Sequence, residues 1–341
     1  MSRSRALQYY ITVRILLAPL MLLTIVTIVF LLLRSTPGDP VDAILGNRAT
    51  EAVKQAYRER LGLSLPLPLQ YLNYLGNLLR LDLGTSITDQ GQVVTDVIKQ
   101  FFPATLELAI FSMIVAIVVG VGMGMLSASR PGTIFDVGGR LFGIITYALP
   151  IFWAGMIVQL IFCVQLRWFP LGSRFPPSLN PPPTITGMYT IDSLLSGNLD
   201  SFVISLHHLA LPSITLGVLI SGIFERIVRV NLRQTLKSDY VEAARARGIP
   251  EMQILFAHAL RNAMIPVITI LGLTFASLLG GAVLTEVTFS WPGLADRLFK
   301  AIELRDYPTV QGIMVFFSTI VVFASIAIDI INALIDPRIR Y

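Results

Sequence analysis

The chain has 341 residues, of which 54% are hydrophobic and 14% charged, and its mean hydropathy is +0.71. An ordinary soluble domain carries about 25% charged residues, so lipid is the expected solvent for most of this chain. The composition excludes a secreted disulfide scaffold, a disordered chain and an ordinary cytosolic enzyme. Because Cys163 is the single cysteine, an intrachain disulfide and a multi-cysteine metal site are excluded as well.

Six stretches are long and apolar enough to cross about 30 Å of hydrocarbon as helices of about 20 residues. The basic residues Arg3 and Arg5 before the first stretch could suggest a signal peptide. That stretch is too long, however, and no small-residue cleavage site follows it. We therefore predict an all-α membrane protein with an uncleaved first span. The six predicted spans are residues 15–33, 106–127, 141–165, 209–225, 262–285 and 312–335.

The formal net charge of +5 comes from residues between the apolar stretches, which indicates topology rather than a nucleic-acid-binding face. One set of connecting segments holds 14 basic residues in 68 positions, whereas the other set holds 12 in 137. Positive residues favour the cytoplasmic side, so we expect the denser set and both termini to be cytoplasmic. The denser set is 1–14, 129–140, 226–261 and 336–341; the other set is 34–102, 166–207 and 286–311.

The three segments expected outside differ in character. Residues 51–60 predict a short polar helix, and residues 70–79 an amphipathic helix suited to a membrane surface or to the bundle. Residues 166–207 are rich in Pro, Ser, Asn and Gly and predict a loop. Residues 286–311 predict a turn at 290–293 followed by a short helix over the outer mouth.

The inside segment after the fourth span favours a capped helix. Asp239 is a candidate N-cap, and Glu242 three residues later would complete a capping box. Ala243 and Ala244 favour helix, and Arg245 suits the helix C-terminus.

A turn and a second helix are predicted directly afterwards. Gly248 can supply the left-handed residue that ends the first helix, and Pro250 suits the first turn of a helix running to about residue 260. These features alone are equally consistent with a simple capped connector. A DNA-binding helix-turn-helix is disfavoured, because an integral membrane loop without a dimer arm is a poor DNA reader.

The same loop carries a family resemblance. Glu242-Ala243-Ala244, three residues, Gly248 and a following helix with His258 and Pro266 resemble the EAA loop of ATP-binding-cassette importer permeases. With other stretches along nearly the whole chain, it resembles the B-type permease subunit of dipeptide and oligopeptide importers. The proline-rich insert at 180–184 departs from the family pattern. The other matching stretches are LRSTPGDP (33–40), LDLGTS (81–86), PATLELA (103–109), EVTFSWPGL (286–294), RDYP (305–308) and DPRIR (336–340).

The resemblance implies a type I importer permease fold with six transmembrane helices. Residues 1–100 would form the first transmembrane helix and a long periplasmic segment, and residues 101–336 the permease domain with its coupling loop at about 238–261. The implied function is ATP-driven import of dipeptides or oligopeptides across the bacterial inner membrane. Nickel, glutathione or another small solute is an alternative substrate, and an ATP-independent secondary transporter is an alternative mechanism. A membrane enzyme is disfavoured, because no catalytic constellation is visible.

The resemblance also implies partners. They are a second, non-identical permease subunit, two cytoplasmic ATP-binding subunits and a periplasmic solute-binding protein, with no nucleic acid. The chain has no P-loop of its own, since none of its four lysines follows a glycine. We therefore expect no cofactor on this chain, and ATP with Mg²⁺ on the partner ATPases. The residues implied to contact the ATPase are Asp239, Glu242, Ala243, Ala244, Gly248 and Pro250.

Two carboxylates lie in or near predicted spans. Buried carboxylates are costly in a membrane, so Glu107 and Asp329 are possible intramembrane polar sites. Structural roles are nevertheless favoured, because Glu107 lies close to the outer end of its span and Asp329 could pair with an arginine. No catalytic or metal residues are predicted, since the adjacent His207 and His208 would point about 100° apart on a helix.

Small residues and prolines inside the spans have structural interpretations. Gly120, Gly122 and Gly124, like Gly272, Ala276 and Gly280, predict close helix packing. Pro150 and Pro212 predict kinks.

Overall fold

The computed structural model describes residues 3–36, 38, 41–42, 49–89, 91–280 and 282–335. Within these ranges every regular element is a helix, which confirms the predicted all-α class. The motif at 336–340 and residues 37, 39 and 40 of the first motif lie outside the described ranges.

Five helical segments are long and apolar enough to span a membrane, and they confirm five of the predicted spans. Each of them except the fourth lies within one long helix. These segments are Thr12–Ser35 in α1 (Arg3–Ser35), α5 (Val94–Ser129), α9 (Leu199–Thr235), Glu251–Leu279 made of α11 (Glu251–Gln253), a π-helical turn (Ile254–Ala259) and α12 (Leu260–Leu279), and Tyr307–Ile331 in α15 (Tyr307–Ile335).

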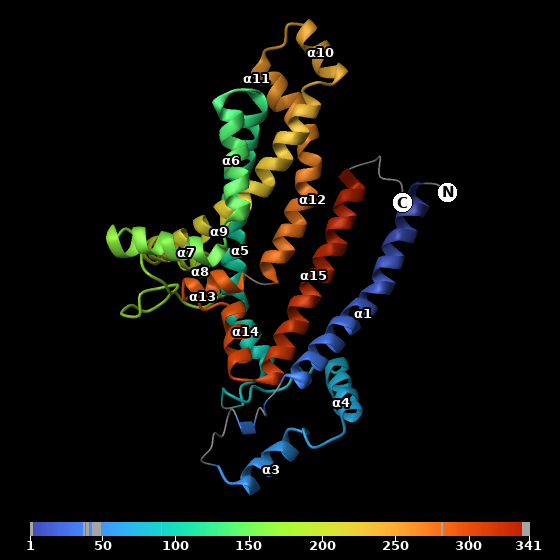
Figure 1. The fold of residues 1–341 in the computed structure, drawn as a ribbon, viewed down its shortest axis with the longest axis vertical. Helices are drawn as coiled ribbons and strands as arrows, with labels where there is room; N and C mark the ends of the chain where they lie inside the picture. The colour runs from blue at the N-terminus through green and yellow to red at the C-terminus, as the bar shows by residue number, and fades with distance from the viewer. Residues whose placement is uncertain are drawn as a thin grey trace.

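The predicted third span is not one straight helix. It is a pair, α6 (Ile134–Ala148) and α7 (Ile151–Gln159) with a π-helical turn (Leu160–Gln165), bent by 100°. At the break Leu149 is extended, as the residue before a proline tends to be, and Pro150 is the N-cap residue of α7. In Figure 1, α7 runs across the bundle while α6 runs along it. The predicted span over 141–165 is therefore broken at Leu149–Pro150, and it makes a sixth span when the bent pair is taken as one.

The predicted fifth span ended too late. α12 stops at Leu279, and residues 283–285 belong to the separate helix α13 (Val283–Thr288). The other short helices are α3 (Glu51–Arg60), α4 (Leu67–Leu79), α8 (Tyr189–Leu195), α10 (Asp239–Ala246) and α14 (Leu294–Glu303).

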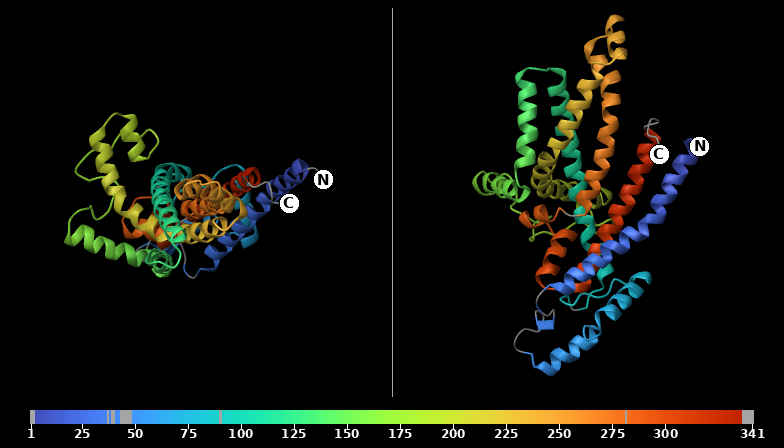
Figure 2. Two further views of the ribbon diagram at one scale, coloured as in Figure 1. Left: turned by 90° about the horizontal axis from the view of Figure 1, so that it is seen from above. Right: turned by 45° about the vertical axis from the view of Figure 1, so that its right-hand side comes forward.

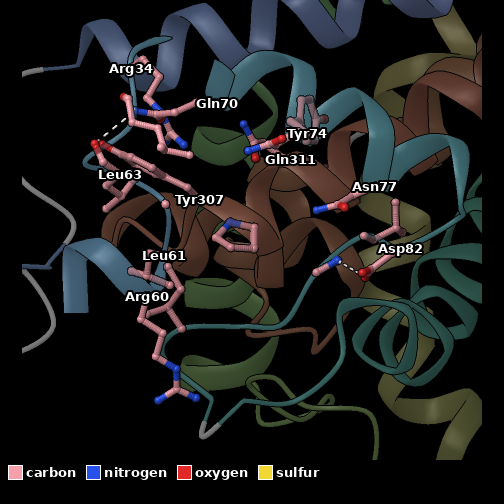
Figure 3. Close-up of a pocket in the computed structure, with 17 residues that line it drawn as sticks. Arg34, Arg60, Leu61, Leu63, Gln70, Tyr74, Asn77, Asp82, Tyr307 and Gln311 are labelled. Carbon is pink, nitrogen blue, oxygen red and sulfur yellow. Dashed lines mark hydrogen bonds between the residues drawn. The ribbon is translucent and has the colours of Figure 1, made fainter. Parts of the chain in front are cut away.

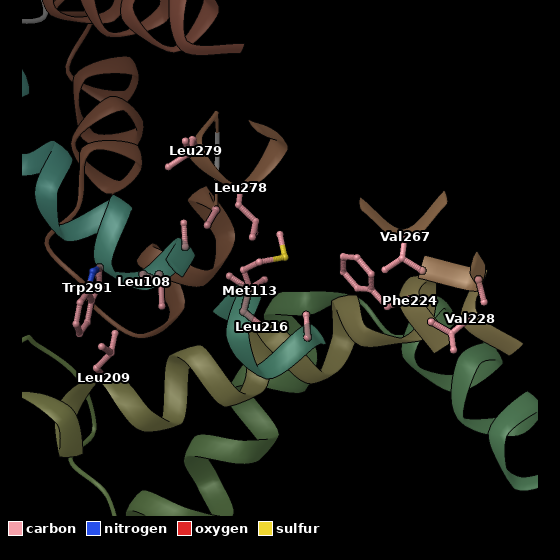
Figure 4. Packing of buried hydrophobic residues seen from close by; sticks show 14 of the residues in the cluster. Leu108, Met113, Leu209, Leu216, Phe224, Val228, Val267, Leu278, Leu279 and Trp291 are labelled. Carbon is pink, nitrogen blue, oxygen red and sulfur yellow. The ribbon is translucent and has the colours of Figure 1, made fainter. Parts of the chain in front are cut away.

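α5 and α9 form the centre of the bundle. α6, α8 and α12 pack against α9, while α15 joins α12 to α1 (Figures 1 and 2). Leu108 and Met113 of α5 and Leu216, Phe224 and Val228 of α9 lie in one buried apolar cluster (Figure 4).

Close packing of α5 on α9 depends on two of the three predicted glycines. A Cβ on Gly120 would lie 2.5 Å from the Ser221 carbonyl oxygen, and one on Gly124 would lie 2.7 Å from Cβ of Val228. At Gly122 a Cβ would meet nothing within 4 Å. The packing prediction is therefore confirmed for Gly120 and Gly124 and wrong for Gly122, which faces away from α9.

Helices α3 and α4 were both predicted, although α4 (Leu67–Leu79) begins three residues before the predicted range 70–79. α3 spans Glu51–Arg60, the predicted range. α4 packs on α1 through its tyrosines, since the Phe30 ring lies 5.2 Å from that of Tyr71 and 5.8 Å from that of Tyr74. The amphipathic segment thus lies against the bundle, with other leucines of α4 exposed.

Candidate functional site

α10 and α11 form a helical hairpin at one end of the molecule (Figure 1). The hairpin has a small core of its own, made of the buried Val241 and Ala244 of α10 and Ile254 of the π-helical turn, with Ile249 packed on them. This small apolar cluster is separate from the main core and packs the two arms of the hairpin against each other.

The helix begins one residue earlier than predicted. Ser238 is the N-cap residue, since its carbonyl accepts hydrogen bonds from the N–H groups of Val241 (2.9 Å) and Glu242 (3.2 Å). Asp239 is therefore the first helical residue, and no side-chain cap is formed. The predicted capping box was wrong; Asp239 and Glu242 instead lie in the first turn, where negative charge interacts favourably with the helix dipole.

Gly248 ends α10 as predicted. Its φ is +74°, and its N–H donates to the Arg245 carbonyl at 2.9 Å while the Ile249 N–H donates to that of Ala244 at 3.3 Å. This pair of bonds is a Schellman motif, which favours glycine at the left-handed position. A Cβ at position 248 would meet no described atom within 4 Å. Within this chain, therefore, the positive φ and not a lack of space is the reason that glycine is favoured there.

An ion pair closes the hairpin. Arg245 donates from Nε to Oε1 of Glu251 at 2.7 Å and from Nη2 to Oε2 at 3.2 Å. Pro250 lies just before α11 rather than in its first turn. Arg245 was predicted only to interact with the helix dipole, and its pair with Glu251 was not predicted. Opposite charges on either side of the predicted turn were the available signal.

The outward face of the hairpin is accessible. Glu242 and Ala243 are exposed, whereas Ala244 faces the small core. The exposed fractions of Met252 and Phe256 are 66% and 49%. The hairpin therefore presents carboxylates, a small side chain and apolar groups together, a combination suited to protein contact.

Two adjoining cavities of about 980 and 510 Å³ lie along α9. Ile151, Ile220 and Ile223 line both of them, so they form one groove. The larger cavity lies between α6 and α9 and the smaller between α9, α12 and α13. The groove is mainly apolar, with Arg140 and Arg226 among the residues that line its larger cavity.

A buried carboxylate borders this groove. Glu225 is fully buried, and its Oε1 accepts a hydrogen bond from Nε of Arg229 at 2.8 Å. Cβ atoms on Gly139 or Gly143 of α6 would lie 3.0 Å from its carboxylate oxygens, so these glycines let α6 approach it. Glu225 was predicted only to end a span, although Arg229, four residues later, was available in the sequence as a partner on the same helix.

Glu107 anchors the proline-rich loop to α5. It is buried, its Oε2 accepts from Nη2 of Arg174 at 2.6 Å, and its Oε1 accepts from N and Oγ1 of Thr190, each at 2.7 Å. The Arg174 guanidinium also lies 3.8 Å from the Tyr189 ring centre. This geometry agrees with the structural role favoured for Glu107.

Asp329 links two spans. Nη2 of Arg14 in α1 lies 3.2 Å from Oδ2 of Asp329 in α15. The structure therefore pairs Asp329 with an arginine, which was one of the roles considered for it, and it does not bring Glu107 and Asp329 together as one site.

Glu286 was missed as a site residue, although it starts one of the matching motifs. Its Oε1 accepts from Thr105 Oγ1 at 2.6 Å and its Oε2 from the Asp296 N–H at 2.8 Å, and the side chain is fully buried. Burial raises the pKa of Glu286 to about 7. Nearby, Trp291 Nε1 donates to the Ala104 carbonyl at 2.9 Å, so α5, α13 and α14 are joined at the end of the bundle away from the hairpin (Figure 1).

Among the residues that the structure describes, no group of three or more His, Cys, Asp or Glu side chains is arranged to hold a metal ion. Nε2 of His207 lies 2.7 Å from the Trp168 carbonyl, and Nδ1 of His208 lies 3.1 Å from that of Ser173. Both histidines thus contact the loop after α7.

The helices, the groove and the protruding hairpin define a polytopic α-helical membrane protein with an exposed contact element at one end of its bundle. Residues 120–341 match the family model "Binding-protein-dependent transport system inner membrane component". Residues 7–109 match the model "Binding-prot-dependent transport system membrane comp, N-term". The chain belongs to this family of binding-protein-dependent transport components.

Several curated proteins are similar over almost their full length. The di/tripeptide transport system permease protein DppB of Pseudomonas aeruginosa is 41% identical, over 92% of this chain and 93% of its own. The dipeptide transport system permease protein DppB of Alkalihalophilus pseudofirmus is 39% identical, over 96% of this chain and 97% of its own length. The oligopeptide transport system permease protein AppB of Bacillus subtilis is 35% identical, over 97% of this chain and 99% of its own length.

Proposed function

We propose that this chain is the permease subunit of an ATP-driven importer that moves dipeptides or oligopeptides inward across the bacterial inner membrane. The peptide assignment is supported by the names of the relatives, which match this chain from end to end. The observation that carries the mechanism is the separately packed hairpin, α10–α11, exposed at one end of the bundle.

The hairpin would couple this chain to a cytoplasmic ATPase. Asp239, Glu242 and Ala243 are exposed and would contact the partner, while Ala244 and Gly248 shape the hairpin and Pro250 starts its second arm. ATP and Mg²⁺ would bind to two such ATPase subunits and not to this chain. Closure of the ATPases would push the hairpin and rock the bundle between inward-open and outward-open arrangements.

The groove along α9 would be this chain's half of the pathway. It is open along one side of the chain, and a second, homologous but non-identical permease would cover it. A periplasmic solute-binding protein would deliver the solute at the end opposite the hairpin. Both termini would be cytoplasmic, in agreement with the density of basic residues.

A matched pair of glycine variants tests the coupling. Gly248→Asp and Gly132→Asp replace residues with nearly the same φ, +74° and +75°, and an added Cβ meets nothing within 4 Å at either. The backbone cost is therefore similar, but only Gly248 lies in the hairpin. We expect Gly248→Asp to lose ATPase co-purification and stimulated ATP hydrolysis, and Gly132→Asp to retain both.

Equal behaviour of the two variants would contradict the coupling role of the hairpin. ATP-independent solute movement by the isolated chain in liposomes would favour the secondary transporter instead. Competition of peptides, glutathione and nickel for uptake by the reconstituted complex separates the substrate classes.

A further inference from the structure

A cavity of about 310 Å³ lies where α1, α4 and the start of α15 meet, at the end of the molecule away from the hairpin (Figures 1 and 3). Its volume is that of a small-ligand site. None of the residues assigned to coupling or to the groove lines it. The polar side chains at its wall include Arg34, Gln70, Tyr74, Asn77, Tyr307 and Gln311.

Three buried polar atoms on this wall have no hydrogen-bond partner within the described part of the chain. They are Nη1 of Arg34, the hydroxyl of Tyr74 and Nε2 of Gln311. Gln311 is only 7% exposed. Burial raises the pKa of Tyr74, which keeps its hydroxyl a donor at neutral pH. Buried donors are nearly always paired, so three on one cavity point to a ligand that supplies acceptors.

The arginine is held in place by other contacts. Its Nε donates to Gln70 Oε1 at 2.8 Å, and Gln70 Nε2 in turn donates to the Leu65 carbonyl at 2.8 Å. The guanidinium also lies 5.0 Å from the centre of the Tyr307 ring. These contacts fix the plane of the guanidinium and leave Nη1 for a ligand, the geometry by which arginine recognises an oxyanion.

The cavity lies where two spans leave the membrane. Arg34 is one residue from the end of the segment Thr12–Ser35, and Tyr307 begins the segment Tyr307–Ile331. A 24-residue helix is longer than the roughly 30 Å of hydrocarbon, so its last turn reaches the headgroup layer. Leu65, just before α4, and Leu72 and Leu79 within it follow one another at intervals of seven residues. They are 41%, 60% and 87% exposed and offer apolar surface near the cavity.

We propose that this cavity binds the headgroup phosphate of an outer-leaflet phospholipid. Arg34, Tyr74 and Gln311 would donate hydrogen bonds to the phosphate oxygens, and the exposed leucines would contact the acyl chains. Apolar surface beside an oxyanion site favours a lipid over a free anion. The choice of the outer leaflet rests on the proposed orientation of the chain. The site itself takes no part in transport, so its failure would leave the proposed function untouched.

The test uses the full-length chain in a mild detergent and native mass spectrometry of bound phosphatidylglycerol. Tyr74→Phe removes one donor, and Gln311→Glu replaces a donor with a negative acceptor of the same shape. We expect retention to fall about fivefold in the first variant and further in the second. Arg80→Gln, an exposed arginine after α4 that does not line the cavity, serves as the control and should bind like the unaltered chain.

Thermal unfolding without lipid separates binding from folding. Because the Tyr74 hydroxyl has no hydrogen-bond partner among the described residues, Tyr74→Phe should be at least as stable as the unaltered chain when delipidated, but should gain less from added lipid. Unchanged retention in Tyr74→Phe and Gln311→Glu would overturn the proposal. So would equal retention of diacylglycerol, or displacement of the lipid by inorganic phosphate or by an acidic peptide.

Discussion

Glu107 and Glu286 are both buried in the part of the bundle away from the hairpin, but their surroundings differ. Glu107 faces the positive charge of Arg174 at 2.6 Å. Glu286 accepts hydrogen bonds from Thr105 and the backbone and has the carboxylate of Asp296 nearby, which adds to the rise in its pKa. Removal of the charge should therefore have different effects at the two positions.

Glu107→Ala should strongly destabilise the protein. It leaves the Arg174 guanidinium buried without its carboxylate, and the loss of one partner of a buried pair costs about 3–5 kcal/mol. The measurement is the apparent melting temperature of the detergent-solubilised chain. Lys99→Ala, which removes an exposed ion pair on the same helix, should change stability by less than about 1 kcal/mol. Similar shifts for both variants would refute this structural role of Glu107.

Glu286 should make stability depend on pH. Its folded pKa of about 7 lies above the ordinary value of 4.5, so the folded state binds more protons between these values. The contribution is therefore fully present below about pH 4.5 and is lost as the pH rises to about 7, by an amount on the order of 3 kcal/mol. Melting temperatures between pH 5 and 8 should fall less steeply in Glu286→Gln than in the unaltered chain. The exposed Glu303→Gln is the control and should leave the slope unchanged.

At the scale of elements, the α5–α9 contact depends on which side of α5 a glycine faces. Gly120→Ala should destabilise the chain by about 1–3 kcal/mol, because its Cβ would meet a backbone oxygen that cannot move aside. Gly122→Ala should be neutral or stabilise by up to about 1 kcal/mol, because its Cβ has space and alanine favours helix. Thermal unfolding of both variants checks this, and equal effects would contradict the packing described for α5 on α9.

Two elements were predicted from the sequence with different success. They are the hairpin α10–α11 and the bent pair α6 and α7. The hairpin was predicted in outline, because its helix, its glycine turn and its second helix depend on neighbouring residues. The start of α10 was missed by one residue. A kink at Pro150 was predicted, but its size of 100° was not, because a proline permits either a mild kink or a complete break and only packing decides between them.

At the scale of the whole molecule, the distribution of basic residues predicts which end faces the cytoplasm. In a Cys163→Ala background, Arg247→Cys in the hairpin should react with a membrane-impermeant maleimide only after permeabilisation of spheroplasts. Asn180→Cys in the proline-rich loop should react in intact spheroplasts; both positions are exposed. The reverse pattern would invert the orientation and place the hairpin away from any cytoplasmic ATPase.

The sequence by itself determined the membrane class, five of the spans, the hairpin and its left-handed glycine. Hydropathy, helix propensity and turn chemistry act within a few turns of the chain, so they can be read from short segments. Only the tertiary structure decided that Glu107 meets Arg174, 67 residues away, and that Glu286 meets Thr105, 181 residues away. It also brought Arg34, Tyr74 and Gln311 to one cavity. These contacts depend on which helix faces pack together, and that is settled by the packing of the whole bundle rather than by any local pattern.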